Sequence, residues 1–455
     1  MESVPGTPPG TSTAAGSRVF LRVLVLAGLV ACVEAPGADE AGGECTGKCD
    51  GTEVAPATLR NRLLANLIGQ RETGTVLFGQ QRFNVTGVDE RGAQWLATAG
   101  AVDRSDARDT TGHHPAVFGF DAWDLAIKPA TWAPTPAVHA EAARYTFTHG
   151  GIVTMDFHQR GCVADSFLAA GNEACLCKVA NDDAFARSWL IDRGYAKVAD
   201  AIEHHGLARI PIIVRPLHEH TGNWFWWGKP FWNCAAYVAN PRVTGAAAYQ
   251  RVFRTIVDYL RDERGLDNLL FAYSPDQLGE QDLEAAYLEG YPGDAYVDVL
   301  GIDLYYRGTP SFTAETARFG RYLATIARLA SERGKAAALT EVGNTLIAAE
   351  TTATTWFSRE LLGLVQSSGI AYAMTWENRE AKPNGFFLPY PAHPSASDLR
   401  TFAASAQTLF LDDARGLYAP TSAAYPVCDA CPAEPVDGRW GWENERSCRV
   451  GSWCL

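Results

Sequence analysis

Short apolar runs recur along the chain and alternate with segments whose apolar residues repeat with a helical period. The runs are rich in β-branched or aromatic residues, which indicates buried strands. Eight candidates follow one another at 76–78, 116–120, 151–155, 210–214, 269–272, 297–302, 336–340 and 370–375. Helical patterns lie between several of them, at 184–205, 246–264, 313–333 and 354–367. This alternation predicts an α/β fold, a closed (β/α)8 TIM barrel.

The N-terminal region predicts export. Two arginines precede or enter an apolar run over residues 19–31, which is too short to span a bilayer but typical of a signal peptide. The run ends in Leu-Val-Ala-Cys32, which resembles the bacterial lipobox. We therefore expect residues 1–32 to be a lipoprotein-like signal peptide with Cys32 lipidated, and a protein held at the bacterial cell surface or outer membrane. The alternative is cleavage near Ala35, which gives a soluble secreted protein.

Three further regions follow the signal peptide. Residues 33–54 are rich in Gly, Ala and acidic residues and read as a linker. Residues 55–417 carry the barrel pattern. Residues 425–455 hold four Cys and three Trp in a span too short for a large core, so we expect a small disulfide-rich C-terminal appendage.

The cysteine count agrees with an oxidising compartment. Of 11 cysteines, ten remain if Cys32 is lipidated or removed, enough for five disulfides whose pairing the sequence does not specify. Zinc is the alternative for Cys175-Leu-Cys177 and for the pair Cys428 and Cys431, but no matching Cys/His pair at zinc-finger spacing accompanies them.

Charge and aromatic content narrow the ligand class. A net charge of -13 argues against nucleic acid or an anionic membrane as a partner. A neutral polysaccharide is indifferent to that charge, and 13 Trp and 16 Tyr suit a protein that handles carbohydrate.

The densest chemistry follows the fourth predicted strand, in Arg215-Pro-Leu-His-Glu-His-Thr-Gly-Asn-Trp-Phe-Trp-Trp-Gly228. Aromatic faces stack on pyranose rings, and a carboxyl group can act on the glycosidic oxygen. Glu219 beside four aromatic residues therefore indicates a sugar-cleaving site. An apolar setting raises the pKa of a carboxyl group, as a general acid requires.

A second carboxylate completes such a site. Glu341 directly follows the seventh predicted strand, and the ends of strands four and seven face one another across a barrel mouth. A retaining glycosidase uses two such carboxyl groups, one as nucleophile and one as acid and then base. Other polar or aromatic residues follow nearly every strand: Gln80, Gln81, Asp121, Trp123, Asp156, His158, His218, Ser274, Asp276, Asp303, Tyr305, Trp376, Glu377 and Asn378.

The stretch from Arg215 to Gly228 closely resembles the acid/base motif of glycoside hydrolase family 26. Four other segments resemble landmarks of that family in the right order: Val76-Leu-Phe-Gly-Gln80, Gly301-Ile-Asp-Leu-Tyr305, Leu339-Thr-Glu-Val-Gly343 and Thr375-Trp376-x-Asn378. The resemblance covers residues 58–410. It implies a (β/α)8 barrel and, in most members, β-1,4-mannanase activity; some members are β-1,3-xylanases or mixed-linkage glucanases.

The resemblance also implies residue roles. Glu219 looks like the acid/base and Glu341 like the nucleophile. Six residues look like substrate-binding or supporting positions: His158, His218, Trp224, Asp303, Tyr305 and Trp376. Glu377 stands where some relatives carry Arg, so we expect the contacts at strand eight to differ.

The resulting expectation is a retaining endo-β-1,4-mannanase that acts as a monomer and needs no metal or organic cofactor. The alternatives are a β-1,3-xylanase or mixed-linkage β-glucanase with the same mechanism, a non-catalytic glycan-binding protein, and a transglycosylase. The segment from Gly438 to Cys448 resembles carbohydrate-binding module family 10, whose members bind cellulose. It places Trp440 and Trp442 as candidate stacking residues; a disulfide-closed tail is the alternative.

Overall fold

The computed structural model describes residues 54–307, 312–345, 347, 354–379, 387–414 and 416–420, and the backbone of two short strands near the C-terminus. Those two strands, β12 (Trp440–Glu443) and β13 (Arg446–Arg449), pair as an antiparallel hairpin. The side chains of Trp440 and Trp442, the signal peptide, Cys32 and the linker lie outside the described residues, so the predictions for them stay predictions.

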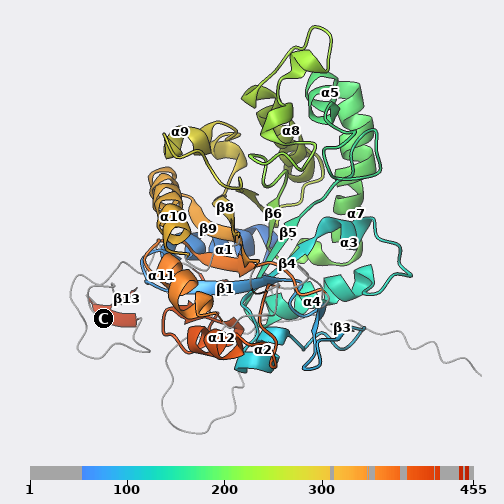
Figure 1. Ribbon diagram of the computed structural model, residues 1–455. Coiled ribbons are helices and arrows are strands. Elements are labelled where there is room, and N and C mark those ends of the chain that lie inside the picture. The colour runs from blue at the N-terminus through green and yellow to red at the C-terminus, as the bar shows by residue number, and fades with distance from the viewer. Residues whose placement is uncertain are drawn as a thin grey trace, which may run out of the picture. The chain divides into compact units, whose positions relative to one another are not determined.

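Eight parallel strands close into a barrel (Figure 1), as the hydrophobic pattern predicted. Each strand pairs with its sequence neighbour, and the last pairs with the first, Leu77 opposite Tyr372. The strands are β1 (Val76–Gln81), β4 (Val117–Asp121), β5 (Ile152–Asp156), β6 (Ile212–Arg215), β7 (Leu269–Tyr273), β8 (Val299–Tyr306), β9 (Ala336–Asn344) and β10 (Tyr372–Thr375).

Helices surround the barrel (Figure 1). The longer ones are α1 (Pro56–Gln70), α4 (Pro136–Thr148), α7 (Ala196–His204), α8 (Ala246–Val257), α10 (Thr313–Arg333) and α12 (Ala396–Ala403). Shorter elements are α2 (Asp106–Thr111), α3 (Ala122–Ala126), α5 (Cys175–Asn181), α6 (Asp183–Phe185), α9 (Leu283–Leu288) and α11 (Leu362–Val365), with a side hairpin of β2 (Thr86–Val88) and β3 (Gln94–Leu96).

Three predicted helices contain wider, π-type turns. These are η1 (Ala186–Tyr195), which joins α6 to α7, η5 (Asp258–Glu263), which directly follows α8, and η7 (Trp356–Leu361), which directly precedes α11. By contrast, α10 is α-helical throughout and ends at Gly334, whose φ of 65° is the left-handed conformation that favours glycine at a helix end.

Alternation along the strands divides the core into two layers. Ile213 and Leu270 point into the barrel, whereas Ile212 and Phe271 point outward against the helices. The inner layer also includes Leu63 of α1, which therefore closes the barrel at the amino ends of the strands.

The end of the barrel domain packs at this same closed end. A two-residue strand, β11 (Thr408–Leu409), pairs with β1 beside the seam. The Asn66 side chain of α1 donates hydrogen bonds to the carbonyl oxygens of Leu417 (2.8 Å) and Ala419 (3.2 Å). The Tyr418 hydroxyl donates to the Gly151 carbonyl, just before β5 begins (2.8 Å). The predicted domain end near residue 417 is thus held at the face opposite the strand ends that carry the candidate site.

Two disulfides lie within the described residues, Cys162–Cys175 and Cys177–Cys234. Cys175 and Cys177 therefore have different disulfide partners, which excludes the zinc alternative for this pair. Among the described residues, no helix is both long and apolar enough to cross a bilayer.

Candidate active site

The backbone around Glu219 places its carboxyl group over the barrel mouth. After β6 the chain turns sharply, and both Leu217 and Glu219 adopt a left-handed φ of 52°. The Glu219 N–H donates to the Ser274 carbonyl beyond β7 (2.7 Å), which fixes this unusual turn. Non-glycine residues keep such a conformation only where their surroundings hold it, and such residues cluster at functional sites.

Glu341 reaches the same mouth through an irregularity in the sheet. Ile302 pairs with Leu339, but the next residue, Asp303, pairs with Glu341, so Thr340 is an extra residue in β9. A bulge of this kind redirects the side chains beyond it. One carboxyl oxygen of Glu219 and one of Glu341 lie within 4.8 Å of one another.

Glu341 is surrounded by groups that favour its ionised form. The Arg215 guanidinium lies 2.5 Å from one carboxyl oxygen, and the Tyr305 hydroxyl donates to the other at 2.7 Å. Burial raises the pKa of Glu341, but the charge of Arg215 and these two hydrogen bonds oppose that rise.

Glu219 faces the aromatic side chain of Trp224 and, within the described part of the chain, has no cationic partner of this kind. Its carboxyl group accepts one hydrogen bond, from the Trp224 indole N–H at 2.6 Å. Burial, and then the negative charge of Glu341, raise the pKa of Glu219 to about 8. Near neutral pH Glu219 is therefore protonated, and Glu341, the member of the pair beside Arg215, is the ionised one.

Arg215 is held by a buried acidic residue beneath the cavity. Both carboxyl oxygens of Asp303 lie 3.2 Å from the Arg215 guanidinium, and the Thr340 hydroxyl donates to Asp303 at 2.6 Å. Asp303 is fully buried and does not line the cavity, so its contacts support Arg215 rather than a ligand.

Within the described residues, two groups of side chains have an arrangement that could hold a cation. Oxygen atoms of Glu219, Asp303 and Glu341 lie within 4.8 Å of one another, as do ligand atoms of Asp156, His158 and His218. In the first group Arg215 already contacts two of the three carboxylates and supplies the positive charge that a metal ion would bring.

The two histidines differ in protonation although their rings lie edge to face, 4.8 Å apart. The Nδ1 atom of His158 lies 3.1 Å from Asp121 and 3.0 Å from Asp156. Although burial disfavours the cation, these two carboxylates raise the pKa of His158 well above its usual value. Burial and the positive charge of His158 lower the pKa of His218, which is therefore neutral.

A cavity of about 400 Å³ lies over the two glutamates. Its walls bring together most of the predicted residues: Glu219, Glu341, His158, His218, Trp224, Tyr305 and Trp376. Of the four consecutive aromatic residues, only Trp224 and Phe225 line the cavity, whereas Trp226 and Trp227 are fully buried in the core. The predicted aromatic wall is therefore half as long as the sequence run.

Sequence reasoning missed several residues of the site. Arg215 was part of the recognised stretch, but nothing in the sequence indicated that it pairs with both Asp303 and Glu341. Phe387 and Arg307 also line the cavity. Phe387 has no neighbouring motif that could have identified it. Glu377 faces Arg82 (2.7 Å) and Arg379 (2.9 Å) instead of the cavity over the glutamates.

Comparisons with known proteins agree with this geometry. Residues 54–360 match the family model "Glycosyl hydrolase family 26", and residues 419–450 match a "Cellulose or protein binding domain". A mannan endo-1,4-β-mannosidase of Bifidobacterium adolescentis is 31% identical over 84% of this chain, which spans 38% of that protein's length.

Solved structures with the same fold cover the barrel. The chain resembles a β-mannanase from Bacteroides ovatus with 26% identity and a TM-score of 0.65, over 81% of this chain and 99% of that one. It resembles a modular endo-β-1,4-mannanase from Cellulomonas fimi with 30% identity and a TM-score of 0.64, over 84% of this chain and 81% of that one. With a family model that spans most of the barrel and two glutamates at the ends of β6 and β9, this chain belongs to glycosyl hydrolase family 26.

Proposed function

We propose that this protein is a retaining endo-β-1,4-mannanase that cleaves internal bonds of mannan-type polysaccharides. The observation that carries the proposal is the contrast between two carboxyl groups within 4.8 Å of one another, one beside Arg215 and one in an apolar setting. Retaining enzymes place their carboxyl groups about 5–5.5 Å apart, whereas inverting enzymes need about 6.5–9.5 Å.

The first step uses both groups at once. The ionised Glu341 attacks the anomeric carbon, and the protonated Glu219 donates its proton to the departing glycosidic oxygen. The products of this step are a glycosyl-enzyme ester on Glu341 and a released sugar chain. Arg215 contacts one oxygen of Glu341 and the Tyr305 hydroxyl contacts the other, so whichever oxygen does not bond to the sugar keeps one hydrogen-bond donor in the ester.

The second step reverses the roles. Glu219, now ionised, takes a proton from water, and the water oxygen attacks the anomeric carbon and breaks the ester to Glu341. The surrounding walls position the sugar: Trp376 and Trp224 offer aromatic faces, and the protonated His158 offers a hydrogen-bond donor.

The choice of mannan is supported by relatives that are named mannan endo-1,4-β-mannosidases. The same two glutamates would serve a β-1,3-xylanase or a mixed-linkage β-glucanase. A non-catalytic glycan-binding protein is disfavoured because both carboxyl groups are present and close. A transglycosylase would need a site that excludes water from the second step.

We further propose that the protein is an exported monomer, secreted or anchored through a lipid on Cys32, and that its C-terminal module binds cellulose through Trp440 and Trp442. The match of residues 419–450 to a cellulose or protein binding domain supports the last point.

Product analysis tests the reaction. Purified protein is incubated with mannan, β-1,3-xylan and mixed-linkage glucan, and the released oligosaccharides and their anomeric configuration are followed over time. We expect β-configured manno-oligosaccharides from mannan. Products from another polysaccharide alone would overturn the substrate, and inverted products would overturn the mechanism.

A further inference from the structure

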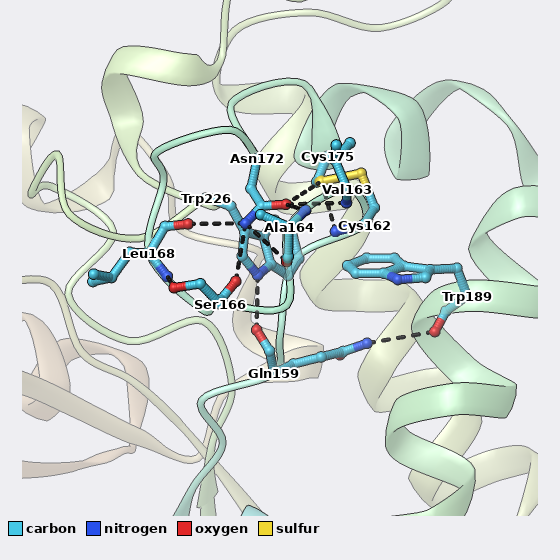
Figure 2. Close-up of a disulfide and its surroundings, with 10 residues drawn as sticks. All are labelled: Gln159, Cys162, Val163, Ala164, Ser166, Leu168, Asn172, Cys175, Trp189 and Trp226. Carbon is cyan, nitrogen blue, oxygen red and sulfur yellow. Dashed lines mark hydrogen bonds between the residues drawn. A yellow bond between two sulfur atoms is a disulfide. The ribbon is translucent and has the colours of Figure 1, made fainter.

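A loop at residues 159–175 packs beside the segment that follows Glu219. It begins soon after β5, and the Cys162–Cys175 disulfide closes it (Figure 2). Among the described residues that line the cavity over the two glutamates, none belongs to this loop. Its fixed internal structure therefore serves something other than direct contact at that cavity.

The side chain of Asn172 holds the interior of the loop (Figure 2) and is fully buried. Its amide oxygen accepts hydrogen bonds from the N–H groups of Val163 (3.0 Å) and Ala164 (2.8 Å). Its amide nitrogen donates to the carbonyl oxygens of Ser166 (2.9 Å) and Leu168 (3.1 Å). Buried polar groups that lose their partners are costly, so this one amide fixes the backbone of residues 163–168.

The loop leaves space for this amide and ties it to the next residues. A methyl group at Gly161 would overlap the Asn172 side-chain amide, so the close approach requires glycine there. The Asn172 N–H also donates to the Ala169 carbonyl at 2.6 Å. Movement of Asn172 should therefore move Ala169 as well.

The loop in turn holds the backbone of Trp224 and its neighbour. The Ala169 N–H donates to the Trp224 carbonyl at 2.7 Å, and Leu168 forms an antiparallel β-bridge with Phe225. Both contacts come from the stretch that the Asn172 amide fixes or adjoins. The backbone from which the Trp224 side chain extends is therefore placed by the loop.

Trp226 attaches the same segment to the start of the loop. It is fully buried, and its indole N–H donates to the carbonyl of Gln159 at 2.9 Å (Figure 2). Its ring lies edge to face with that of Trp189, with centroids 5.3 Å apart. Each of the three residues 224–226 thus has a contact with the loop.

The half-buried Trp224 side chain reaches from this segment to the acid/base. Its indole N–H donates to Glu219 at 2.6 Å, and this is the one hydrogen bond that the carboxyl group accepts within the described residues. The ring lies against Gly222, where a methyl group would overlap it. A hydrogen bond weakens steeply when its distance and angle change, so the bond to Glu219 depends on where the loop holds the Trp224 backbone.

Within the described part of the chain, the charged groups that face Glu219 come from other elements than this loop. In the loop itself, Arg160 and Asp165 pair with one another at the surface, 3.0 Å apart. The titratable groups that face Glu219 are Glu341 on β9, Asp276 beyond β7, His158 beyond β5, and Asp303 and Tyr305 on β8. The loop therefore acts on Glu219 through the position of the indole and not through charge.

We propose that Asn172 is a positioning residue for the acid/base: it fixes the disulfide-closed loop, and the loop holds the Trp224 indole N–H against the Glu219 carboxyl group. Asn172 touches neither the substrate cavity nor Glu219, and it acts through Ala169 and Trp224. The inference rests on the proposed function for the catalytic role of Glu219, but not for the contact between the indole and the carboxyl group.

The first test needs no activity. In 15N-labelled protein, the Trp224 indole N–H resonance is assigned by its loss in Trp224→Phe and is followed as pH is varied on either side of 8, where Glu219 titrates. In Asn172→Ala we expect this resonance to shift and its titration midpoint to move to higher pH, because a weaker hydrogen bond favours the ionised carboxyl group less.

Asn268→Ala is the matched control. Asn268 is also fully buried and donates to two backbone carbonyls, those of Leu207 (3.1 Å) and Ile210 (2.7 Å), but it lies just before β7, at the amino ends of the strands. It should lower stability without moving the Trp224 resonance or its titration.

The second test measures kcat/KM on mannan and on an aryl β-mannoside whose leaving group needs no proton. Asn172→Ala should lower kcat/KM on mannan roughly 3- to 10-fold at neutral pH, because the proton donor is less well oriented, and should change the aryl mannoside little. In the Trp224→Phe background Asn172→Ala should add no further loss and no further shift of the basic limb, since the contact through which it acts is gone.

An unchanged Trp224 resonance in Asn172→Ala would overturn the proposal, as would the same loss with and without the Trp224 indole. If Asn172→Ala does not fold, Gly161→Ala takes its place, because it displaces the amide while keeping both of its polar atoms. A resonance that titrates and that either variant shifts, in a protein whose wild type cleaves no mannan, would keep the positioning role and overturn the proposed reaction.

Discussion

The ends of strands β6 and β9 carry the same residue type in opposite settings. At β9, Glu341 lies against Arg215 and accepts a hydrogen bond from Tyr305. At β6, Glu219 follows a left-handed turn, faces Trp224 and has no cation in contact within the described residues. The difference shows that position on the barrel rim decides which glutamate holds a proton, because burial acts on both and only one is given a counter-charge.

Removal of each glutamate should have the largest effect on activity and tests this contrast most directly. Glu341→Ala should lower kcat on every substrate by on the order of 10⁴-fold, because no nucleophile remains. Glu219→Ala should lower kcat/KM on mannan by roughly 10²- to 10⁴-fold, but far less on an aryl mannoside whose leaving group needs no proton.

Steady-state kinetics on both substrates measure the difference. Glu289→Gln, at an exposed ion pair with Lys229, is the control and should behave like wild type. If both alanine variants lost the same factor on both substrates, the assignment of distinct roles would be wrong.

The second test removes the counter-charge. Arg215→Met leaves Asp303 and Glu341 buried without a cation and should lower the free energy of unfolding by about 3–5 kcal/mol at neutral pH. The folded-state pKa values of both carboxyl groups then rise further above their unfolded values. In the folded variant both carboxyl groups are therefore more stable protonated than ionised. The free energy of unfolding should be highest at low pH and should fall as pH rises above about 4, where these groups ionise in the unfolded chain.

Urea unfolding at pH 5 and pH 8 measures this effect. Arg264→Met, which breaks exposed pairs with Asp200 and Glu203, provides the comparison and should cost little at either pH. A variant equally stable at both pH values would show that Arg215 does not set the ionisation of Glu341.

The third test concerns the two disulfides of the described residues. Both lie in the segments that follow β5 and β6, next to Glu219 and away from Glu341. Cys162→Ser with Cys175→Ser opens a link of 13 residues and should lower the free energy of unfolding by about 3 kcal/mol. Cys177→Ser with Cys234→Ser opens a link of 57 residues and should cost about 4 kcal/mol.

Urea unfolding of each double variant, with oxidised wild type alongside, gives these values. The pH dependence of kcat/KM in the first variant sharpens the comparison. We expect a change only in the limb that reports Glu219. The Cys162–Cys175 disulfide closes a loop whose Ala169 N–H donates to the Trp224 carbonyl, and the Trp224 indole donates to Glu219. A change in the limb that reports Glu341 would contradict this separation.

The smallest expected effect is a shift in one limb of the pH profile. With the pKa of Glu219 at about 8, kcat/KM should fall as pH rises past 8, because the acid loses its proton. The Trp224 indole N–H donates to this carboxyl group and favours its ionised form. Trp224→Phe should therefore raise the pKa of Glu219 further and move the basic limb to higher pH.

The matched control is Trp356→Phe, a buried position packed on Tyr306 and Phe357. A pH profile of kcat/KM in each variant gives the comparison. A basic limb that moves to lower pH in Trp224→Phe would mean that the indole stabilises the protonated acid instead.

The fold could be predicted because its signals are local. Each strand is a short apolar run followed by polar residues. Eight such units that alternate with helices indicate a sheet closed into a (β/α)8 barrel. The wider turns in η1, η5 and η7 were not predictable. Their buried residues, such as Ala186, Leu190 and Gly194 of η1, still recur about every four positions, as in an ordinary α-helix.

The site could be predicted in part. Both glutamates follow apolar strands within recognisable motifs, so their place at the mouth followed from strand order. The pairing of Arg215 with Asp303 and Glu341 depends on side-chain direction in three different strands, which periodicity does not specify. Likewise, Phe387 lies in a loop, where no repeat tells which way a side chain points.

The attachment of the domain's last residues to α1 has a practical consequence for immobilisation. Asn66 and Tyr418 hold residues 417–419 at the amino ends of the strands, while both glutamates lie at the carboxyl ends. A bead, a dye or a fused partner joined just after residue 420 is therefore tethered behind the barrel. An enzyme fixed to a solid support through this end keeps its cleft turned toward the solution.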